Sequence, residues 1–314
     1  MSLTTVRIGD SVVCKVGLGL MRLTWTPNPV PYDQAFDAIK AAIDAMPAGV
    51  KLFLNSGEFY GNNLTEANLD LLASFFEKYP GYADKTFLSV KGASKPGVLY
   101  PDSSEGNLRR SVDNINKHLR GTKKLDLFEC ARVDPEVPIE ECTRTLQKLI
   151  EEGRFSYIGM SEPDSVTLRR AHAVHPIAAV EIQLSPWAYK GEMKKIVSAS
   201  EELGITVVGY SLFRGLATQQ TGSRGRSALH FDRFSGEHNM NEGLRKIAER
   251  KGVSTGQLCI AWVASLGDHV MPLPGSSKRS QVLENLAAGS FNLTTKESDE
   301  IIQLVEGTNV HEDR

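Results

Sequence analysis

Cysteine is scarce in this chain, which has four cysteines among 314 residues and no Cys-x-x-Cys pair. The seven histidines form no cluster with the spacing of metal ligands. The sequence therefore predicts no metal site. Widely spaced cysteines are also typical of a compartment in which thiols stay reduced.

Long hydrophobic runs and a large net charge are absent as well. No apolar run approaches the roughly 18 to 20 residues that span a bilayer, and residues 1–7 lack the hydrophobic segment of a secretory signal. The net charge is −2, so no basic field attracts nucleic acid or an anionic membrane. We therefore expect a cytoplasmic protein with no nucleic-acid or membrane partner, and we expect it to be a monomer or a weak homo-oligomer.

Hydrophobic residues make up 41% of the chain, which is enough for a large core. Short apolar runs alternate with amphipathic segments throughout, and no Pro/Ser-rich linker divides them. Strands that alternate with helices pair in parallel through right-handed crossovers. The expected strands are Lys15–Leu20, Val50–Leu54, Thr86–Val90, Leu125–Glu129, Phe155–Met160, Ala179–Gln183, Ile205–Gly209 and Val270–Leu273. The expected helices include Tyr32–Ala45, Leu64–Lys78, Ser104–Leu119, Ile139–Glu152, Ser165–Val174 and Gly191–Leu203.

Eight such strands favour a closed (β/α)8 TIM barrel, as one α/β domain over residues 1–314, over an open doubly wound sheet. Three segments fall outside this repeat. Val6–Gly9 and Ser11–Cys14 predict an N-terminal β-hairpin that turns at Gly9-Asp10, and Thr295–Val305 predicts an extra C-terminal helix outside the barrel. The segment 215–237 is long, polar and rich in glycine, which is typical of a lid, a binding loop or a mobile surface loop.

Polar residues follow three successive strands at the point where each strand ends. Asn55-Ser56-Gly57-Glu58-Phe59-Tyr60-Gly61 follows the second barrel strand, Lys91-Gly92 the third, and Ala131-Arg132-Val133-Asp134 the fourth. Because the carboxyl ends of parallel strands share one rim, Tyr60 and Lys91 are expected to share a pocket. A phenol beside an ammonium is suited to protonating the oxygen of a carbonyl group that is being reduced. The ammonium is expected to lower the pKa of the phenol from its ordinary value near 10.

Several short segments together carry a family resemblance. They are Gly17-Leu18-Gly19, the Asn55-to-Gly61 segment, Val90-Lys91, Arg132-Val133-Asp134-Pro135, Ile158-Gly159-Met160-Ser161, the Gln183 segment, Gly209-Tyr210-Ser211-Leu212, Pro274-Gly275-Ser276-Ser277 and Glu284-Asn285-Leu286. In this order, each at a strand end, they resemble the aldo-keto reductases over nearly the full length of the chain. The resemblance implies reduction of an aldehyde or ketone by NADPH, with Tyr60 as the general acid assisted by Lys91.

Two positions depart from the usual pattern of that family. Asn55 stands where an aspartate is usual, and Ala131 stands where a histidine is usual. Asn55 can accept a hydrogen bond from Lys91 but brings no charge, so we expect a less compensated Lys91 with a lowered pKa that acts more strongly on Tyr60. Ala131 removes a donor to the carbonyl oxygen, which costs on the order of 10²-fold in rate if nothing replaces it. Either the substrate is an activated, bulky aldehyde, or the site mainly binds nucleotide.

The first alternative fits a branch of the family. Asn55 together with Glu-Phe-Tyr-Gly, Ser-Val-Lys-Gly and Cys-Ala-Arg-Val-Asp resembles the fungal pyridoxal reductases, which implies reduction of pyridoxal to pyridoxine. Pyridoxal carries substituents on both sides of its aldehyde, so Ala131 leaves room for it, and Trp25 is a candidate for lining an aromatic pocket. The alternatives are a general aldehyde or ketone reductase and, in another class, an NADP(H)-binding regulatory subunit resembling the β subunits of potassium channels.

The resemblance also implies the cofactor residues. Tyr210 would stack on the nicotinamide, Ser161 and Gln183 would bind its carboxamide, and Glu162 stands where the family often has Asn. Lys278 and Arg279, which open a helix after a glycine-containing turn, suit the 2′-phosphate of NADPH. The full predicted set is Gly19, Leu20, Met21, Ser161, Gln183, Tyr210, Ser211, Leu212, Arg214, Gly215, Gly275, Ser277, Lys278, Gln281, Glu284 and Asn285. No Gly-x-Gly-x-x-Gly motif follows a strand, so a Rossmann site is not expected.

Overall fold

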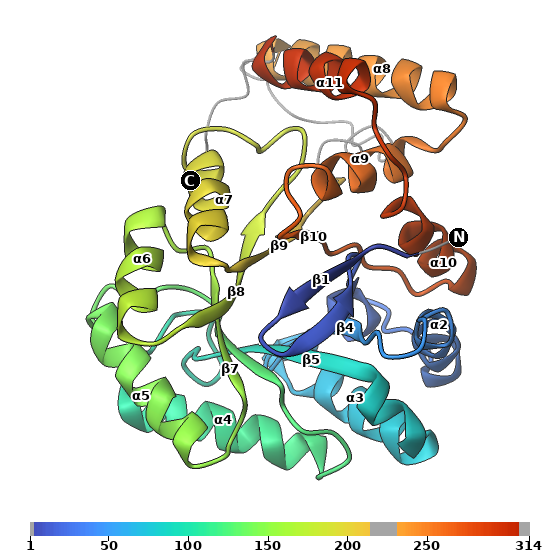
Figure 1. Cartoon of the computed structure of the whole chain (residues 1–314). Coiled ribbons are helices and arrows are strands. Elements are labelled where there is room, and N and C mark those ends of the chain that lie inside the picture. The colour runs from blue at the N-terminus through green and yellow to red at the C-terminus, as the bar shows by residue number, and fades with distance from the viewer. Residues whose placement is uncertain (1–2, 214–230, 308–314) are drawn as a thin grey trace.

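Parallel strands form a ring at the centre of the molecule in the computed structural model (Figure 1). The structure describes residues 3–213 and 231–307. Each strand of the ring pairs in parallel with its neighbours in the sequence. The strands are β3 Leu18–Gly19, β4 Leu52–Gly57, β5 Thr86–Gly92, β6 Leu127–Cys130, β7 Tyr157–Ser161, β8 Ile177–Gln183, β9 Thr206–Tyr210 and β10 Val270–Pro272.

Backbone hydrogen bonds join the first and last strands of this sheet. The N–H of Gly17 donates to the carbonyl of Pro272 at 3.0 Å, and the N–H of Gly19 donates to the carbonyl of Pro274 at 2.9 Å. These bonds close the sheet on itself beside β3 and β10. The predicted (β/α)8 barrel is confirmed, and each of the eight predicted strands overlaps an observed one.

Helices surround the ring on its outer side (Figure 1). Their apolar faces recur at helical spacing and pack on the strands; in α4, for example, Leu108, Val112, Ile115 and Leu119 are fully buried. The helices are α1 Met21–Thr24, α2 Tyr32–Asp44, α3 Ala67–Lys78, α4 Glu105–Leu119, α5 Ile139–Glu151, α6 Ser165–Val174, α7 Glu192–Leu203, α8 Phe231–Lys251, α9 Thr255–Ala264, α10 Arg279–Ala288 and α11 Thr295–Gly307. Short 3-10 helices lie at Asn62–Leu64 and Pro80–Lys85. No helix among the described residues is long and apolar enough to span a membrane.

The predicted hairpin is confirmed as β1 Thr5–Ile8 and β2 Ser11–Cys14, with Gly9 at a φ of 55° in the turn. Its apolar side chains Val6, Ile8 and Val13 pack in one cluster with apolar side chains of the barrel strands. The carbonyl of Val12 accepts from the N–H of Lys51, just before β4. The hairpin therefore covers the amino-terminal end of the barrel, which leaves the chemistry to the opposite rim.

The predicted loop 215–237 is wrong at its carboxyl end, because residues 231–237 belong to α8. That helix packs on α11, outside the ring of strands (Figure 1). Sequence reasoning missed this helix because most of residues 231–237 are polar and one of them is glycine. The rest of the predicted loop lies outside the described residues. The predicted C-terminal helix is confirmed as α11.

Candidate active site

The loop that carries Tyr60 is tied to the strand ends on both sides. The N–H of Glu58 donates to the carbonyl of Lys91 at 2.7 Å, and the hydroxyl of Thr24 donates to the carbonyl of Tyr60 at 2.5 Å. Gly57 lets the Tyr60 ring lie against the strand, because a Cβ atom there would stand 2.7 Å from the ring. Tyr60 is only 6% exposed, so its phenol is held in a fixed, nearly dry position.

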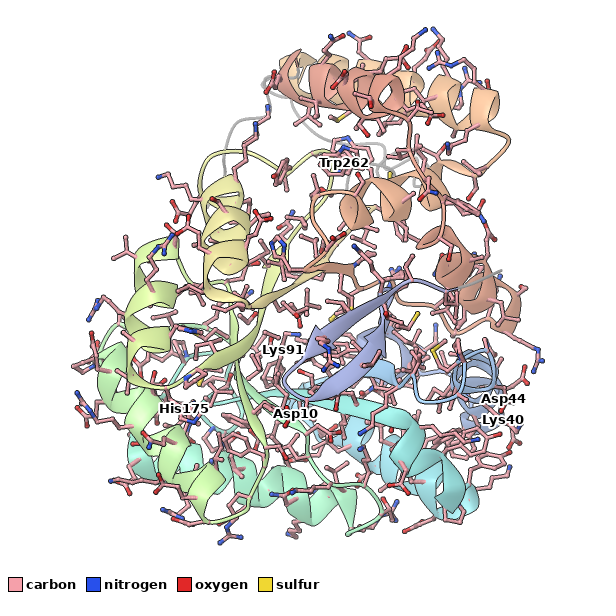
Figure 2. All side chains as sticks on the ribbon, in the orientation of Figure 1. Asp10, Lys40, Asp44, Lys91, His175 and Trp262 are labelled. Atoms are coloured by element: carbon pink, nitrogen blue, oxygen red, sulfur yellow. The ribbon has the colours of Figure 1, made fainter. Side chains whose placement is uncertain are left out.

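Lys91 lies inside the ring of strands, and Figure 2 shows it near the middle of the molecule. Its Nζ donates to Oδ1 of Asn55 at 2.9 Å and to Oε2 of Glu181 at 2.6 Å. Glu129 Oε1 lies 3.6 Å away. The same Nζ is 5.8 Å from the centre of the Tyr60 ring. The structure therefore brings together the three predicted catalytic residues Tyr60, Lys91 and Asn55.

Sequence reasoning missed Glu129 and Glu181. Each comes from the interior of a barrel strand, Glu129 from β6 and Glu181 from β8, and each is almost fully buried. Strands of a parallel barrel are buried on both faces and read as continuous apolar runs. A charged residue within such a run was the signal, because an isolated buried carboxylate is costly and needs a partner.

These two glutamates overturn the predicted electrostatics of Lys91. Burial alone lowers the pKa of Lys91, but the charges of Glu129 and Glu181 outweigh it, so the pKa lies above its usual value. The prediction of a lowered Lys91 pKa is therefore wrong. Asn55 indeed supplies no charge, but Glu181 supplies it from another strand.

The predicted lowering of the Tyr60 pKa is also wrong. Burial raises the pKa of Tyr60; the charge of Lys91 and a hydrogen bond from it lower the pKa, and the charges of Glu181 and Glu129 raise it again. The net result is a pKa above the ordinary value of 10. Tyr60 is therefore a protonated phenol at neutral pH, as a proton donor must be.

Two aromatic rings lie beside Tyr60, and one of them belongs to Trp25, the residue predicted to line the substrate pocket. The Trp25 ring centre lies 5.6 Å from that of Tyr60 and 6.0 Å from that of Phe59. Ala131 follows β6 directly, is 7% exposed, and its N–H donates to the carbonyl of Gly92 at 3.0 Å. Ala131 is therefore next to the end of β5, the strand that carries Lys91.

Three predicted cofactor residues end neighbouring strands. Ser161 ends β7 and pairs in register with Glu181, while Gln183 ends β8 and pairs with Tyr210, the last residue of β9. Glu162, where the family often has Asn, accepts the N–H of Gln183 at 2.7 Å. Burial, and then the charge of Glu162, raise the pKa of Tyr210. Ser161, Gln183 and Tyr210 therefore end three strands that are neighbours in the barrel.

Most of the other predicted cofactor residues lie near the start of α10 or near the seam, which is the junction of β3 and β10 that closes the barrel. A Cβ atom at Gly275 would stand 2.8 Å from the Gly19 carbonyl, so the two backbones meet there. Glu284 accepts a hydrogen bond from Ser254 at 2.9 Å. Gln281 accepts one from Ser276 at 2.9 Å, and Ser277 accepts one from Gln34 at 3.3 Å. Asn285 lies in the second turn of α10, and Met21, Ser211 and Lys278 are exposed.

Not every predicted cofactor residue is free to meet a ligand. Leu20 is fully buried, its N–H donates to the carbonyl of Asn55 at 3.0 Å, and its carbonyl accepts from Asn68 at 3.0 Å. Leu212 is also buried among apolar residues. Arg214 and Gly215 lie outside the described residues. The side chains of Leu20 and Leu212 thus belong to the buried apolar core.

The site is thus a buried tyrosine and lysine at the carboxyl-terminal rim of a (β/α)8 barrel. The model of the aldo/keto reductase family matches residues 15–306, and the chain belongs to this family. It is 34% identical over 307 residues to a Schizosaccharomyces pombe protein named probable pyridoxal reductase 2, which covers 93% of this chain and 91% of that protein. It is 32% identical to the aldo-keto reductase str7 of Strobilurus tenacellus over 331 residues, or 100% of this chain and 95% of that protein.

Solved structures agree on the fold. The glycerol dehydrogenase AKR11B4 of Gluconobacter oxydans superposes with a TM-score of 0.81 at 22% identity and covers 100% of this chain and 98% of that chain. An aldo-keto reductase of Klebsiella pneumoniae, solved in complex with NADPH, superposes with a TM-score of 0.74 at 20% identity over 97% of this chain and 96% of that chain.

Proposed function

We propose that this protein reduces an aldehyde to an alcohol with NADPH, and that Tyr60 is the general acid. The observation that carries the proposal is the buried pair of Tyr60 and Lys91 at the barrel rim, with the Nζ of Lys91 5.8 Å from the Tyr60 ring centre. A carbonyl oxygen gains negative charge during reduction and must receive a proton. The raised pKa of Tyr60 keeps that proton on the phenol at neutral pH.

The residues at the start of α10 are suited to hold a phosphate group of a dinucleotide. Helix α10 begins after Lys278 with no side-chain cap, so its first N–H groups are suited to a phosphate oxygen. Lys278 is exposed at this point, and Arg279 pairs with Asp37 at 3.0 Å. Tyr210, Ser161 and Gln183 lie at the rim between this helix and Lys91 in the order of the strands. NADPH bound there would supply a hydride to the carbonyl carbon.

The chain's own residues would then handle the carbonyl oxygen. Tyr60 donates its hydroxyl proton to this oxygen, and the nearby Lys91 ammonium stabilises both the developing alkoxide and the phenolate left on Tyr60. Asn55 and Glu181 hold Nζ in place through their hydrogen bonds. The low exposure of Tyr60 and Lys91, 6% each, excludes water and strengthens these charge interactions.

Pyridoxal is the substrate that we propose. The rings of Trp25 and Phe59 beside Tyr60 suit a planar aromatic aldehyde, and Ala131 leaves space next to β5. The relative named probable pyridoxal reductase 2 supports the same choice. A general aldehyde or ketone reductase with another substrate would share the Tyr60 and Lys91 chemistry but not this preference.

Steady-state NADPH oxidation with pyridoxal, 4-nitrobenzaldehyde and a simple ketone tests the proposal. We expect the highest kcat/KM with pyridoxal. A higher value with either of the other two would keep the reductase and reject pyridoxal. NADPH binding without turnover of any of the three would support the regulatory alternative, a subunit that resembles the β subunits of potassium channels.

A further inference from the structure

The interior of the barrel below Tyr60 holds two buried carboxyl groups beside the ammonium of Lys91. Lys91 faces two carboxyl groups, Glu181 Oε2 at 2.6 Å and Glu129 Oε1 at 3.6 Å. All three side chains are nearly fully buried, at 7% exposure or less. Two ionised carboxylates against one ammonium in such a dry place would leave one charge uncompensated, which is costly.

The two glutamates are not equivalent. Glu181 Oε2 accepts hydrogen bonds from both Lys91 and the Nδ2 of Asn55, the latter at 2.8 Å. Glu129 Oε2 accepts a longer bond of 3.2 Å from the hydroxyl of Ser89, and Glu129 Oε1 is buried with no hydrogen-bond partner among the described residues. The geometry therefore stabilises the charged form of Glu181 and leaves Glu129 as the group that holds a proton.

On the basis of the proposed reductase function, we propose that Glu181 is the positioning residue that holds the Lys91 ammonium for Tyr60, and that Glu129 is its protonated partner. In this arrangement the carboxylate that balances the lysine comes from β8 instead of from position 55 on β4. Asn55 bridges the two by accepting from Lys91 and donating to Glu181, which an aspartate could not do.

The charge state of Glu129 then changes with pH. Burial, and next the charge of Glu181, raise the pKa of Glu129 to about 8. Below that pH the cluster holds one carboxylate per ammonium; above it, a second carboxylate faces Lys91 and weakens its action on the developing alkoxide. The titratable or charged groups that face this cluster are Tyr60, Lys91, Cys130, Glu181 and Tyr210.

The pH profile of kcat in the Glu129→Gln enzyme tests the second half of the proposal. We expect the parent kcat to fall by about 5-fold between about pH 7 and about pH 9, and the glutamine variant to lose this step, because its amide cannot ionise. Glu140→Gln on α5 is the control, since this glutamate lies outside the barrel, is 30% exposed and pairs with Arg170. A step that persists in Glu129→Gln would overturn the role of Glu129.

The Glu181→Gln enzyme tests the first half. We expect kcat to fall by at least about 10-fold with the Kd of NADPH within about 3-fold of the parent, because the shortest contact of Nζ loses its negative charge. Adding Asn55→Asp to this variant should recover most of the loss, since a carboxylate oxygen then stands at the 2.9 Å position of Asn55 Oδ1. Parent-like kcat in Glu181→Gln, or no recovery in the double variant, would overturn the role of Glu181.

A titration that needs no turnover separates this proposal from the reductase proposal. The phenolate absorbance of Tyr60 is obtained by subtracting the spectrum of the matching Tyr60→Phe variant in each background. Because the charge of Glu181 raises the pKa of Tyr60, Glu181→Gln should lower that pKa. If the parent turned over no aldehyde, the reductase proposal would fail, and this titration alone would decide the role of Glu181. An unchanged Tyr60 pKa in Glu181→Gln would reject the proposed role of Glu181.

Discussion

Tyr60 and Lys91 come from different strand ends, yet the Nζ of Lys91 lies 5.8 Å from the centre of the Tyr60 ring. The main chain fixes this relationship, because the N–H of Glu58, two residues before Tyr60, donates to the carbonyl of Lys91 itself at 2.7 Å. The phenol and the ammonium are thus held together before any substrate binds, which is the form of preorganisation that favours proton donation to a developing charge.

Tyr60→Phe should lower kcat with pyridoxal by at least about 10²-fold, because it removes the proton donor and no other hydrogen-bonding group takes its place on the ring. Binding of NADPH, measured by fluorescence titration, should stay within about 3-fold of the parent value. Tyr32→Phe is the control, since Tyr32 is exposed on α2. A Tyr60→Phe enzyme with kcat near the parent value would show that another group protonates the product.

The raised pKa of Tyr60 predicts how the reaction depends on pH. A general acid acts in its protonated form, so activity in the direction of reduction is present below the pKa and is lost as the pH rises through it. Burial is the largest cause of that raised pKa and is kept in the Glu129→Gln enzyme. This variant, which lacks the proposed step near pH 8, should therefore keep its kcat from about pH 6 to about pH 9. A decline of kcat within this range in that variant would contradict the raised Tyr60 pKa.

Ala131→His should discriminate between substrates by size. Ala131 is 7% exposed beside the end of β5, so an imidazole there would take up space next to the carbonyl group of a bound aldehyde. We expect kcat/KM with pyridoxal to fall by about 10-fold or more, while a small aliphatic aldehyde keeps or gains activity from the added donor. Ala131→Ser, which adds little volume, is the matched control. An equal loss with both aldehydes would reject the steric explanation.

Lys278→Ala should weaken the binding of NADPH more than the binding of NADH. Lys278 is exposed at the uncapped start of α10, and an exposed charge pair contributes about 0.5 to 1 kcal/mol, which corresponds to roughly 2- to 5-fold in Kd. The loss should shrink at high salt, because screening weakens exposed pairs. Lys296→Ala, an exposed lysine on α11, is the control. An equal change for both dinucleotides would remove Lys278 from the 2′-phosphate site.

The barrel and the pair of Tyr60 and Lys91 could be predicted because each corresponds to a local pattern in the sequence. Buried strands read as apolar runs, and Tyr60 and Lys91 directly follow two of them. The charge balance could not be predicted in this way, because it depends on which side chains meet across the barrel. Lys91 on β5 reaches Glu181 on β8, and no local pattern relates these two strands. A prediction based on position 55 alone therefore gave the wrong direction for the shift in the pKa of Lys91.

Gly275→Ala tests the seam where the barrel closes. A Cβ atom at this position would stand 2.8 Å from the carbonyl oxygen of Gly19, and the N–H of Gly19 donates to the carbonyl of Pro274 next to it. Since both sides of this close contact are backbone, the clash is relieved only if β3 and the segment after β10 move apart. We expect a loss of about 1 to 3 kcal/mol in the free energy of unfolding and a higher KM for NADPH.

The matched control for this substitution is Gly106→Ala in the first turn of α4, where an added Cβ atom meets nothing within 4 Å. Alanine is the better helix former, so this variant should gain up to about 1 kcal/mol. Urea unfolding of both variants measures the two effects with opposite signs. Because the seam joins the first and last strands of the barrel, an unchanged midpoint for Gly275→Ala would mean that these strands part without cost and that the seam does not stabilise the closed barrel.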